Sequence, residues 1–344
     1  MTSTIFAIGR FMWMYITLIM VCSATVQEDK RELNARIIGG KVANPIRFPY
    51  FTFVALKIRI PGSTKVESDR CGGSLIARDV VLTAAHCIDA NLPIVSVAVK
   101  VNYTSDVETT GYEYPRKVIK RIPHPNYNSD TDEADLGILI LDRPVNGVPL
   151  IKLNSISSTP KVGQSLSVIG FGYVDNEETD PEYLMEVSVP TVSQQDCNDS
   201  NSYDGKIVQS AMICAGSPQG GKDSCNGDSG GPLFIRGKTA SEDIQVGIVS
   251  FGDASGCAEP DYPGVYTRVS TYLKWIQDTI CQNSKFKPST CANVNPPTPT
   301  KKPTRKRTPS PTFPPTEEPS EAPVEPPVQS PVSNPVNSPV STPV

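Results

Sequence analysis

The stretch GKDSCNGDSGGPLF, from Gly221 to Phe234, carries the most informative pattern in this 344-residue chain. It contains four glycines, two serines and two aspartates, and it becomes apolar at its end. Hydroxyl and carboxyl groups gathered in a glycine-rich loop directly before a buried strand indicate a chemically active loop. The pattern therefore raises two questions, namely which serine reacts and what each aspartate does.

The sequence on either side of this loop consists of short β-rich runs from Ile37 to about Asn283. Clusters of Gly, Pro, Asn and Asp separate the runs, which favours an all-β sandwich or barrel over alternating βαβ units. Residues 271–280 (TYLKWIQDTI) place apolar side chains at helical intervals and predict a terminal helix. The β-rich runs are FTFVALKIRI (51–60), VVLTAAHC (80–87), VSVAVKV (95–101), GILIL (137–141), SLSVIGFG (165–172), MEVSVP (185–190), IQVGIVSFG (244–252) and VYTRV (265–269).

The first residues read as a targeting segment. Arg10 precedes an apolar run from Phe11 to Val21, and small residues follow, so residues 1–24 are predicted to be a cleaved signal peptide. The alternative is an uncleaved membrane anchor, but the run is short for a span of about 20 residues. Residues 25–36 are polar and without periodicity and are interpreted as a propeptide. The mature protein is therefore expected to be secreted, with no membrane span.

Cysteine usage agrees with an extracellular location. Removal of the signal peptide takes away Cys22 and leaves eight cysteines, an even number that favours structural disulfides in an oxidising compartment. A zinc site is the rival interpretation. It is weak because the chain has no CxxC pair and only two histidines, His86 and His124.

Residues 284–344 are predicted to form a tail, and the composition changes completely after Cys291. Sixteen of the 33 prolines follow Pro288, so this segment cannot bury enough apolar surface to fold and is expected to be extended and disordered. Two interpretations stay open. The tail is either an inert spacer or a glycosylated stalk that contacts a cell wall or matrix.

Five motifs follow one another along the chain, and one of them, GDSGGP, lies within the opening stretch. They are IIGG (37–40), TAAHC (83–87), DLGILIL (135–141), GDSGGP (227–232) and SFG (250–252). Together they resemble the chymotrypsin/trypsin family of serine endopeptidases. The resemblance covers about residues 37–280. It implies two packed antiparallel six-stranded β-barrels with a C-terminal helix, in a protease domain over residues 37–283.

The resemblance also implies catalytic roles. Ser229 would be the nucleophile and His86 its general base, because a serine hydroxyl is a poor nucleophile until a base takes its proton. Asp135 would orient the imidazole; it is preferred over neighbouring acids because it directly precedes an apolar run. The backbone N–H groups of Gly227 and Ser229 would form the oxyanion hole. His124 lies in a stretch that resembles a non-catalytic part of the family.

The two aspartates receive different roles from the same resemblance. Asp228 would form a buried ion pair with the new amino terminus of Ile37 after cleavage at Arg36–Ile37. Asp223 would lie at the floor of the primary specificity pocket and select Arg or Lys before the scissile bond. The further pocket residues implied are Ser224, Ser250, Gly252 and Gly264.

Three disulfides follow from the resemblance, namely Cys71–Cys87, Cys197–Cys214 and Cys225–Cys257. Cys281 and Cys291 are left over and can pair with each other. Asn102 and Asn198 are glycosylation acceptors if the chain is secreted.

Two features depart from the family pattern. Phenylalanine replaces the usual tryptophan in SFG (250–252) and in GFG (170–172), and Asp253-Ala-Ser255 lengthens the pocket rim. No cofactor and no metal are expected. The net charge of −4 gives no reason to expect nucleic acid.

The sequence thus predicts a secreted, trypsin-like serine endopeptidase that cleaves after Arg or Lys and is activated at Arg36–Ile37. Its partners would be protein or peptide substrates with Arg or Lys, and protease inhibitors. The alternative is a catalytically inactive homologue that binds or inhibits another secreted enzyme. The retained His86, Asp135 and Ser229 argue against this alternative.

Overall fold

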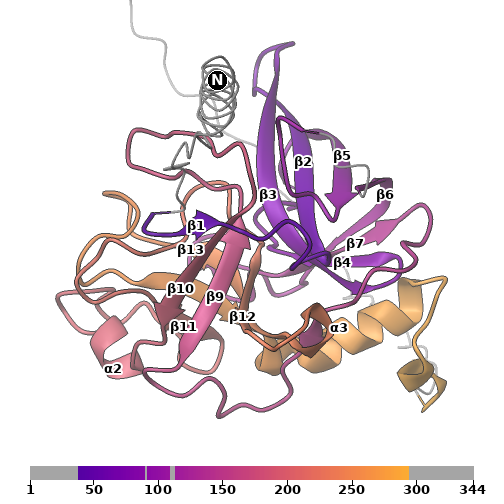
Figure 1. The fold of residues 1–344 in the computed structure, drawn as a ribbon. Coiled ribbons are helices and arrows are strands. Elements are labelled where there is room, and N and C mark those ends of the chain that lie inside the picture. Colours follow the sequence, from indigo (N-terminus) through magenta and orange to yellow (C-terminus); the bar gives the residue numbers. More distant parts are fainter. Residues whose placement is uncertain (1–37, 90, 109–112, 294–344) are drawn as a thin grey trace, which may run out of the picture. The chain divides into compact units, whose positions relative to one another are not determined.

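The computed structural model describes residues 38–89, 91–108 and 113–293. The predicted signal peptide and propeptide, Ile37, and the tail after Asn293 lie outside the described residues. Within them the structure is mostly β, with two groups of strands and a helix near the end (Figure 1). The predicted all-β class with a terminal helix is confirmed.

The first group of strands is a closed, antiparallel barrel. Apolar side chains of β2 alternate inward, as at Val54 and Leu56, which are both buried, while Lys57 and Arg59 face solvent. The barrel order is β2 (Phe51–Arg59), β3 (Val66–Ala77), β4 (Val80–Thr83), β7 (Gly137–Leu141), β6 (Tyr114–Pro123) and β5 (Ile94–Val101).

The second group is a sheet of eight strands. Its six longer strands correspond to the predicted second barrel, and β1 (Lys41–Val42) and β8 (Lys152–Leu153) add short edge pairings. Backbone hydrogen bonds bring its two ends together, from Val192 N–H to the Cys214 carbonyl (2.9 Å) and from Gly216 N–H to the Pro190 carbonyl (3.0 Å). The six longer strands run in the order β10 (Met185–Pro190), β9 (Ser165–Gly170), β12 (Pro232–Ile235), β13 (Ile244–Phe251), β14 (Gly264–Arg268) and β11 (Met212–Ala215).

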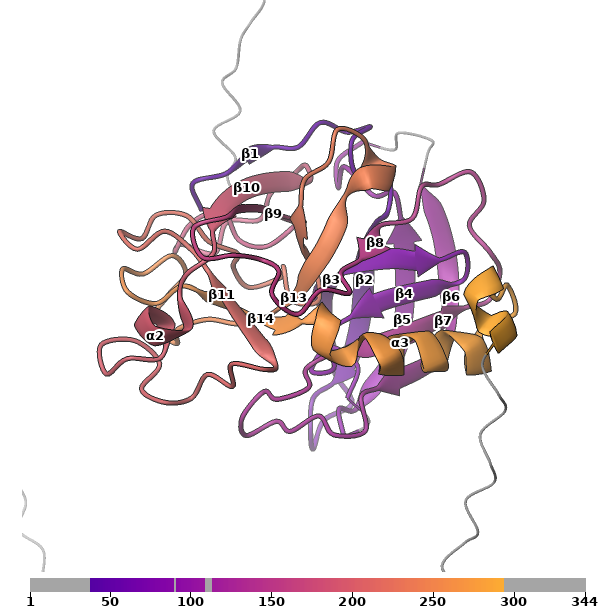
Figure 2. The ribbon, with the colours of Figure 1, turned by 90° about the horizontal axis from the view of Figure 1, so that it is seen from below.

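The long helix α3 (Val269–Asn283) follows directly from β14 and lies across the barrel beside β7 (Figure 2). Its buried Ile276 and Ile280 belong to the same apolar core as the barrel. The other helical segments are α2 (Gln194–Cys197) and the short 3₁₀ turns η1 (Ala240–Glu242) and η2 (Ser289–Asn293). In the part of the chain that the structure describes, no helix is both long and apolar enough to cross a bilayer.

Contacts with the barrel continue past Asn283, the predicted end of the protease domain. Ser284 Oγ and Lys285 N–H both donate to the buried carboxylate of Asp79, at 2.5 and 2.9 Å. A disulfide between Cys281 and Cys291 then closes the segment. One carboxylate and one disulfide therefore hold this segment, and composition alone does not reveal such contacts.

The structure contains the three disulfides that the resemblance implied, Cys71–Cys87, Cys197–Cys214 and Cys225–Cys257. The pairing of Cys281 with Cys291, reached by counting the remaining cysteines, is present as well.

A buried ion cluster joins the start of the described chain to the second sheet. The carboxylate of Asp243, fully buried before β13, accepts two hydrogen bonds from Arg47 (2.6 and 2.7 Å) and one from Tyr50 Oη (2.6 Å). Gly237 N–H supplies a fourth donor at 2.7 Å. Since each oxygen is satisfied, the buried charge is tolerated.

We predict that Asp243→Ala lowers the free energy of unfolding by about 3–5 kcal/mol, because it leaves the partly buried Arg47 guanidinium without its counter-ion. Urea denaturation followed by tryptophan fluorescence measures the change. The control is Asp278→Ala, which removes the largely exposed pair with Lys274 on α3 and should cost less than about 1 kcal/mol. Equal losses in the two variants would contradict the assignment of Asp243 as a buried anchor.

Candidate active site

His86 and Asp135 are brought together by two neighbouring strands of the barrel. β4 pairs with β7 so that Thr83 lies opposite Gly137. His86 follows β4 and Asp135 precedes β7, so both residues lie just beyond the same end of the ladder. His86 Nδ1 lies 2.8 Å from Asp135 Oδ2, and His86 N–H donates to Asp135 Oδ1 at 2.9 Å.

The second sheet contributes two further donors to the same aspartate. Ser250 Oγ, on β13, donates to Asp135 Oδ2 at 2.6 Å, and Thr267 Oγ1, on β14, donates to the Asp135 carbonyl at 2.7 Å. Asp135 is fully buried. Ser250 therefore contacts the acid directly, a role beyond the pocket lining predicted for it.

The charges of His86 and Asp135 are coupled. Burial alone would raise the pKa of Asp135, but the charge of His86 and hydrogen bonds from His86 and Ser250 hold that pKa below its ordinary value. Burial alone would lower the pKa of His86, whereas the charge and hydrogen bond of Asp135 raise it above its ordinary value. The pair thus favours an ionised carboxylate and stabilises the protonated imidazole.

The loop that bears Ser229 is attached to the barrel next to His86. The Ser229 carbonyl accepts the N–H of Gly72 at 2.7 Å and lies 3.7 Å from Cys87 Sγ. Gly230 has φ of +81°, and a Cβ atom there would lie 2.2 Å from Thr83 Oγ1. A residue with a side chain would therefore prevent the loop from approaching β4.

No hydrogen bond joins the His86 ring to the Ser229 hydroxyl in the described structure. Catalytic hydrogen bonds are often long or poorly aligned in structures without substrate.

The N–H groups of Gly227 and Ser229 are among the backbone donors of this loop that have no protein acceptor in the described residues. The N–H groups of Asp228, Gly230 and Gly231 bond to carbonyls, whereas those of Gly227 and Ser229 do not. Gly227 adopts φ of +97°, and a Cβ atom there would lie 2.7 Å from Arg70 Nε. Glycine at this position thus allows the two free donors, the pair predicted for the oxyanion hole, to coexist with Arg70.

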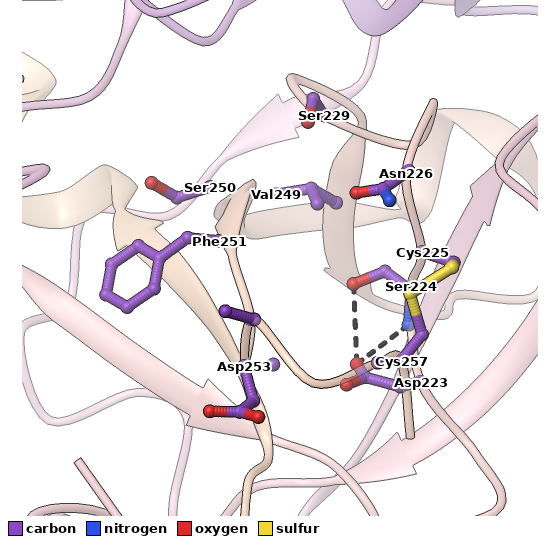
Figure 3. A pocket seen from close by; sticks show the side chains of 14 residues that line it. Asp223, Ser224, Cys225, Asn226, Ser229, Val249, Ser250, Phe251, Asp253 and Cys257 are labelled. Carbon is purple, nitrogen blue, oxygen red and sulfur yellow. Dashed lines mark hydrogen bonds between the residues drawn. A yellow bond between two sulfur atoms is a disulfide. The ribbon is translucent and has the colours of Figure 1, made fainter. Parts of the chain in front are cut away.

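A cavity of about 350 Å³ opens beside Ser229 (Figure 3). Asp223 and Ser224 lie at one end of it, and the segment from Val249 to Asp253 forms a wall. The predicted pocket residues Asp223, Ser224, Ser250, Gly252 and Gly264 all line this cavity.

Asp223 is 4% exposed, and burial raises the pKa of its carboxyl to about 7. Its Oδ1 accepts the N–H of Ser224 at 2.7 Å. A Cβ atom on Gly264 would lie 2.5 Å from this same oxygen, so glycine is required there to leave room for the acid. In contrast, a Cβ on Gly252 would meet nothing within 4 Å.

Sequence reasoning missed Tyr266 as part of this pocket. Its fully buried hydroxyl lies 3.1 Å from Ser224 Oγ and 3.5 Å from Asp223 Oδ1. Tyr266 belongs to the run VYTRV, which the sequence marked only as a strand. Its position beside Gly264 at the start of β14 was the available signal.

Asp228 is fully buried and does not line the cavity that contains Asp223. Its Oδ1 accepts Gly172 N–H at 2.7 Å and its Oδ2 accepts Cys225 N–H at 2.9 Å. Cβ atoms on Gly170 or Gly172 would lie 2.0 and 2.4 Å from its oxygens, so both glycines make room for the carboxylate. Burial raises the pKa of Asp228 to about 6. No described cation forms a salt bridge with it.

His124 lies apart from these groups. It packs between Tyr272 and Trp275 of α3, with ring centroids 5.1 and 4.6 Å away, and burial lowers its pKa. Cys71, His86 and Cys87 are close enough in space to suggest a metal site, but the two cysteines form a disulfide and cannot act as thiolate ligands.

The predicted glycosylation acceptors differ in their surroundings. Asn198 caps α2, and its side chain exchanges hydrogen bonds with the backbone of Ile207 at 2.9 and 3.2 Å. Asn102 lies directly after β5, with φ of +59°.

Comparison with known proteins agrees with this geometry. A family model described as Trypsin matches residues 37–276. Relatives include the clotting factor G beta subunit of Tachypleus tridentatus, 35% identical over 263 residues that make up 72% of this chain and 81% of the relative. Trypsin eta of Drosophila melanogaster is 33% identical (71% of this chain, 88% of the relative), and the vitellin-degrading protease of Bombyx mori is 35% identical (71% and 86%). The chain therefore belongs to the trypsin family and is a serine-type endopeptidase.

Proposed function

We propose that this endopeptidase hydrolyses peptide bonds after Arg or Lys through an acyl-enzyme formed on Ser229. The observation that carries this proposal is the carboxylate of Asp223, buried at one end of a cavity that also reaches Ser229. A buried acid without a cation is costly, whereas a substrate guanidinium or ammonium would satisfy it. An apolar side chain in the same cavity would leave the acid unpaired, which disfavours such substrates.

In the proposed reaction, His86 takes the proton of the Ser229 hydroxyl as the oxygen attacks the scissile carbonyl. Asp135, held by His86 and Ser250, keeps the imidazole oriented and stabilises its charged form. The unpaired N–H groups of Gly227 and Ser229 would receive the developing oxyanion, which is where such donors stabilise the transition state most. His86 then gives its proton to the leaving amine, and water releases the acyl group.

The inactive-homologue alternative has no specific support. Every group named in the proposed mechanism is present, and the relatives described above bear the names of proteases or of a clotting factor subunit.

We predict that Asp135→Asn lowers kcat about 10⁴-fold while the protein remains folded, because the same change in the family's template enzyme leaves the imidazole in the wrong tautomer. Hydrolysis of an arginine ester by the activated protein measures the loss, and circular dichroism checks the fold. Asp132→Asn, a change in a half-buried acid of the same loop, serves as the control and should keep most of the activity. Normal turnover by Asp135→Asn would rule out the proposed role.

We predict that Asp223→Ser lowers kcat/KM for arginine esters by about 10²–10³-fold, corresponding to the loss of a buried charge partner. The rate on a phenylalanine ester should fall much less or rise, because the cavity loses its buried charge. The ratio of kcat/KM values for the two esters is the measurement. A ratio unchanged by the substitution would contradict Asp223 as the specificity group.

The pKa of Asp223, raised to about 7 by burial, sets the expected pH dependence. The cation-binding form is the ionised one, which is present above that pKa and is lost as pH falls through it. KM for the arginine ester should therefore rise nearly tenfold per pH unit below about pH 7. KM for the phenylalanine ester should stay flat, while protonation of His86 lowers kcat for both.

We further propose that cleavage at Arg36–Ile37 activates the enzyme, with the new ammonium group of Ile37 pairing with Asp228. The support comes from the position of Ile38 and from the surroundings of Asp228. Ile38, the next residue, has its carbonyl 3.4 Å from Asp223 N–H, and the buried Asp228 carboxylate has no described cationic partner. Ionising Asp228 without a partner costs stability as pH rises from about 4 to about 6, since the folded-state pKa exceeds the unfolded value.

We predict that Arg36→Gln, which removes the cleavage site, leaves an inactive precursor when the protein is treated with trypsin. Wild-type precursor treated in the same way should gain activity and, above pH 6, become more stable to urea, because the ammonium group now pairs with the buried charge. Full activity in an uncut chain that begins before Arg36 would refute the switch.

Secretion, the signal peptide over residues 1–24, and glycosylation at Asn102 and Asn198 remain parts of this proposal. The four disulfides support an oxidising, extracellular location. Contact of the tail with a wall or matrix rests on composition alone.

A further inference from the structure

Three neighbouring strands of the barrel, β2, β5 and β6, contain cations and no acids. β5 pairs with β2 on one side and with β6 on the other. The chain as a whole carries a net charge of −4, so this segregation is not a general property of its surface. The cations are Lys57, Arg59, Lys100, Arg116, Lys117, Lys120 and Arg121.

The strand register shows which of these side chains share the outer face. Lys57 lies opposite Ser96, Lys100 opposite Phe53, and Lys117 opposite Ala98. These positions alternate with buried residues such as Val54 and Val99, so they point away from the barrel interior. Lys57, Lys100 and Lys117 thus form one exposed face, which we call the basic face.

Few carboxylates compensate this charge. None of the seven cations forms a salt bridge within the described residues. Glu67 and Asp69 of β3 pair with Ile58 and Leu56, whose side chains alternate with Lys57, although Asp69 also lines a cavity with Lys57. Asp142 lies near the end of β6, where its carboxylate accepts the backbone N–H of Lys117 and its charge partly offsets that of Arg143 at Arg116.

Like charges are crowded at that same end of β6. Arg116 and Arg143 both donate to the Pro115 carbonyl, at 2.8 and 3.3 Å. Burial, followed by the nearby charge of Arg143, lowers the pKa of Arg116. Arg116 Nε and Arg121 Nη1 are buried without a hydrogen-bond partner in the described structure. An anionic partner would relieve this repulsion.

The basic face continues from the active site. A cavity of about 460 Å³ is lined by Phe53, Ala55 and Lys57 of β2 and by Asn226 and Gly227 of the Ser229 loop. Asp69, Arg70 and Asp180 also line it, and Asp180 is paired there with Arg70. Asn226 also lines the cavity that contains Asp223, whose other wall is β13 and the segment after it. A substrate with its basic side chain beside Asp223 would pass Ser229 and enter the second cavity with the residues that follow the scissile bond.

The far end of the face is partly apolar. Val95 and Ile119 are 49% and 53% exposed, and they line a cavity of about 230 Å³ together with Lys120 and Arg121. A surface of mixed cations and apolar side chains suits a peptide with acidic and apolar residues. A sulfated glycan, which is uniformly anionic and polar, would leave these apolar side chains uncovered.

We propose that the basic face is a docking surface for an acidic and apolar segment of the protein substrate, located after the scissile bond. This inference rests on the proposed cleavage after Arg or Lys. Two spacings of about 4.8 Å separate β2 from β6, and an extended chain covers about 3.3 Å per residue, so about three residues cross the face. The acidic segment therefore begins within a few residues of the cleaved bond.

The kinetic test uses activated wild-type enzyme and two peptides with one arginine followed by about ten residues. One peptide has several glutamates and leucines after the arginine, and the other has glutamine in place of each glutamate. We expect kcat/KM about tenfold higher for the glutamate peptide at about 50 mM NaCl, with the advantage lost at about 0.5 M NaCl because salt screens exposed charges.

Lysine variants test whether the basic face causes the preference for the glutamate peptide. The triple variant Lys57→Gln, Lys100→Gln and Lys117→Gln should remove the preference for glutamate and leave hydrolysis of a tripeptide arginine amide unchanged. The matched control, Lys152→Gln, Lys161→Gln and Lys238→Gln, removes three exposed lysines elsewhere and should keep the preference. Equal rates on the two peptides with wild-type enzyme, or a preference that survives the first triple variant, would overturn the proposal.

A binding measurement separates this inference from the proposed function. The segment after the arginine, labelled with fluorescein and lacking any basic residue, is titrated with Ser229→Ala protein, and anisotropy gives Kd. We expect about tenfold weaker binding by the triple variant, whether or not the wild type cleaves arginine substrates. Binding of heparin but not of the acidic peptide would assign the face to a glycan and overturn the proposal.

Discussion

The buried carboxylate of Asp135 is the constraint on which the arrangement of the two halves depends. It is fully enclosed and receives hydrogen bonds from His86 of the barrel and from Ser250 of the second sheet, while Thr267 binds its carbonyl. A charge at this depth is tolerated only when all of its donors are in place. The barrel alone brings His86 and Asp135 together, and the second sheet completes the hydrogen bonds to the aspartate.

The two buried acids of the Ser229 loop, Asp223 and Asp228, each require a glycine in the neighbouring backbone. Two acids from one short stretch are buried in different directions, and each needs space on the backbone that faces it. Gly264 provides that space for Asp223, and Gly170 and Gly172 provide it for Asp228. Because a methyl group at any of these positions would lie within 2.5 Å of a carboxylate oxygen, the acids and the glycines depend on one another.

The sequence was sufficient for the fold class, the family and three disulfides, because long motifs in a fixed order carry more information than isolated residues. It was insufficient where residues far apart in the chain meet. The contact of Gly172 with Asp228 and the hydroxyl of Tyr266 beside Ser224 depend on strand register, which local periodicity does not reveal. The basic face is another case, since Lys57 and Lys117 become neighbours only once β5 lies between their strands. The anchoring of Ser284 and Lys285 by Asp79 is a further contact between distant residues that composition does not reveal.

The placement of α3 has a consequence for synthesis of the chain. The barrel is complete at Leu141, but the helix that packs beside β7 begins at Val269, after the entire second sheet. The ribosome synthesises the chain from its amino terminus, so the barrel emerges before the helix exists. The apolar surface that Ile276 and Ile280 later bury is exposed to solvent until translation is nearly finished. During that interval the nascent barrel exposes an apolar surface that favours self-association. A chain truncated before Val269 would keep this surface exposed.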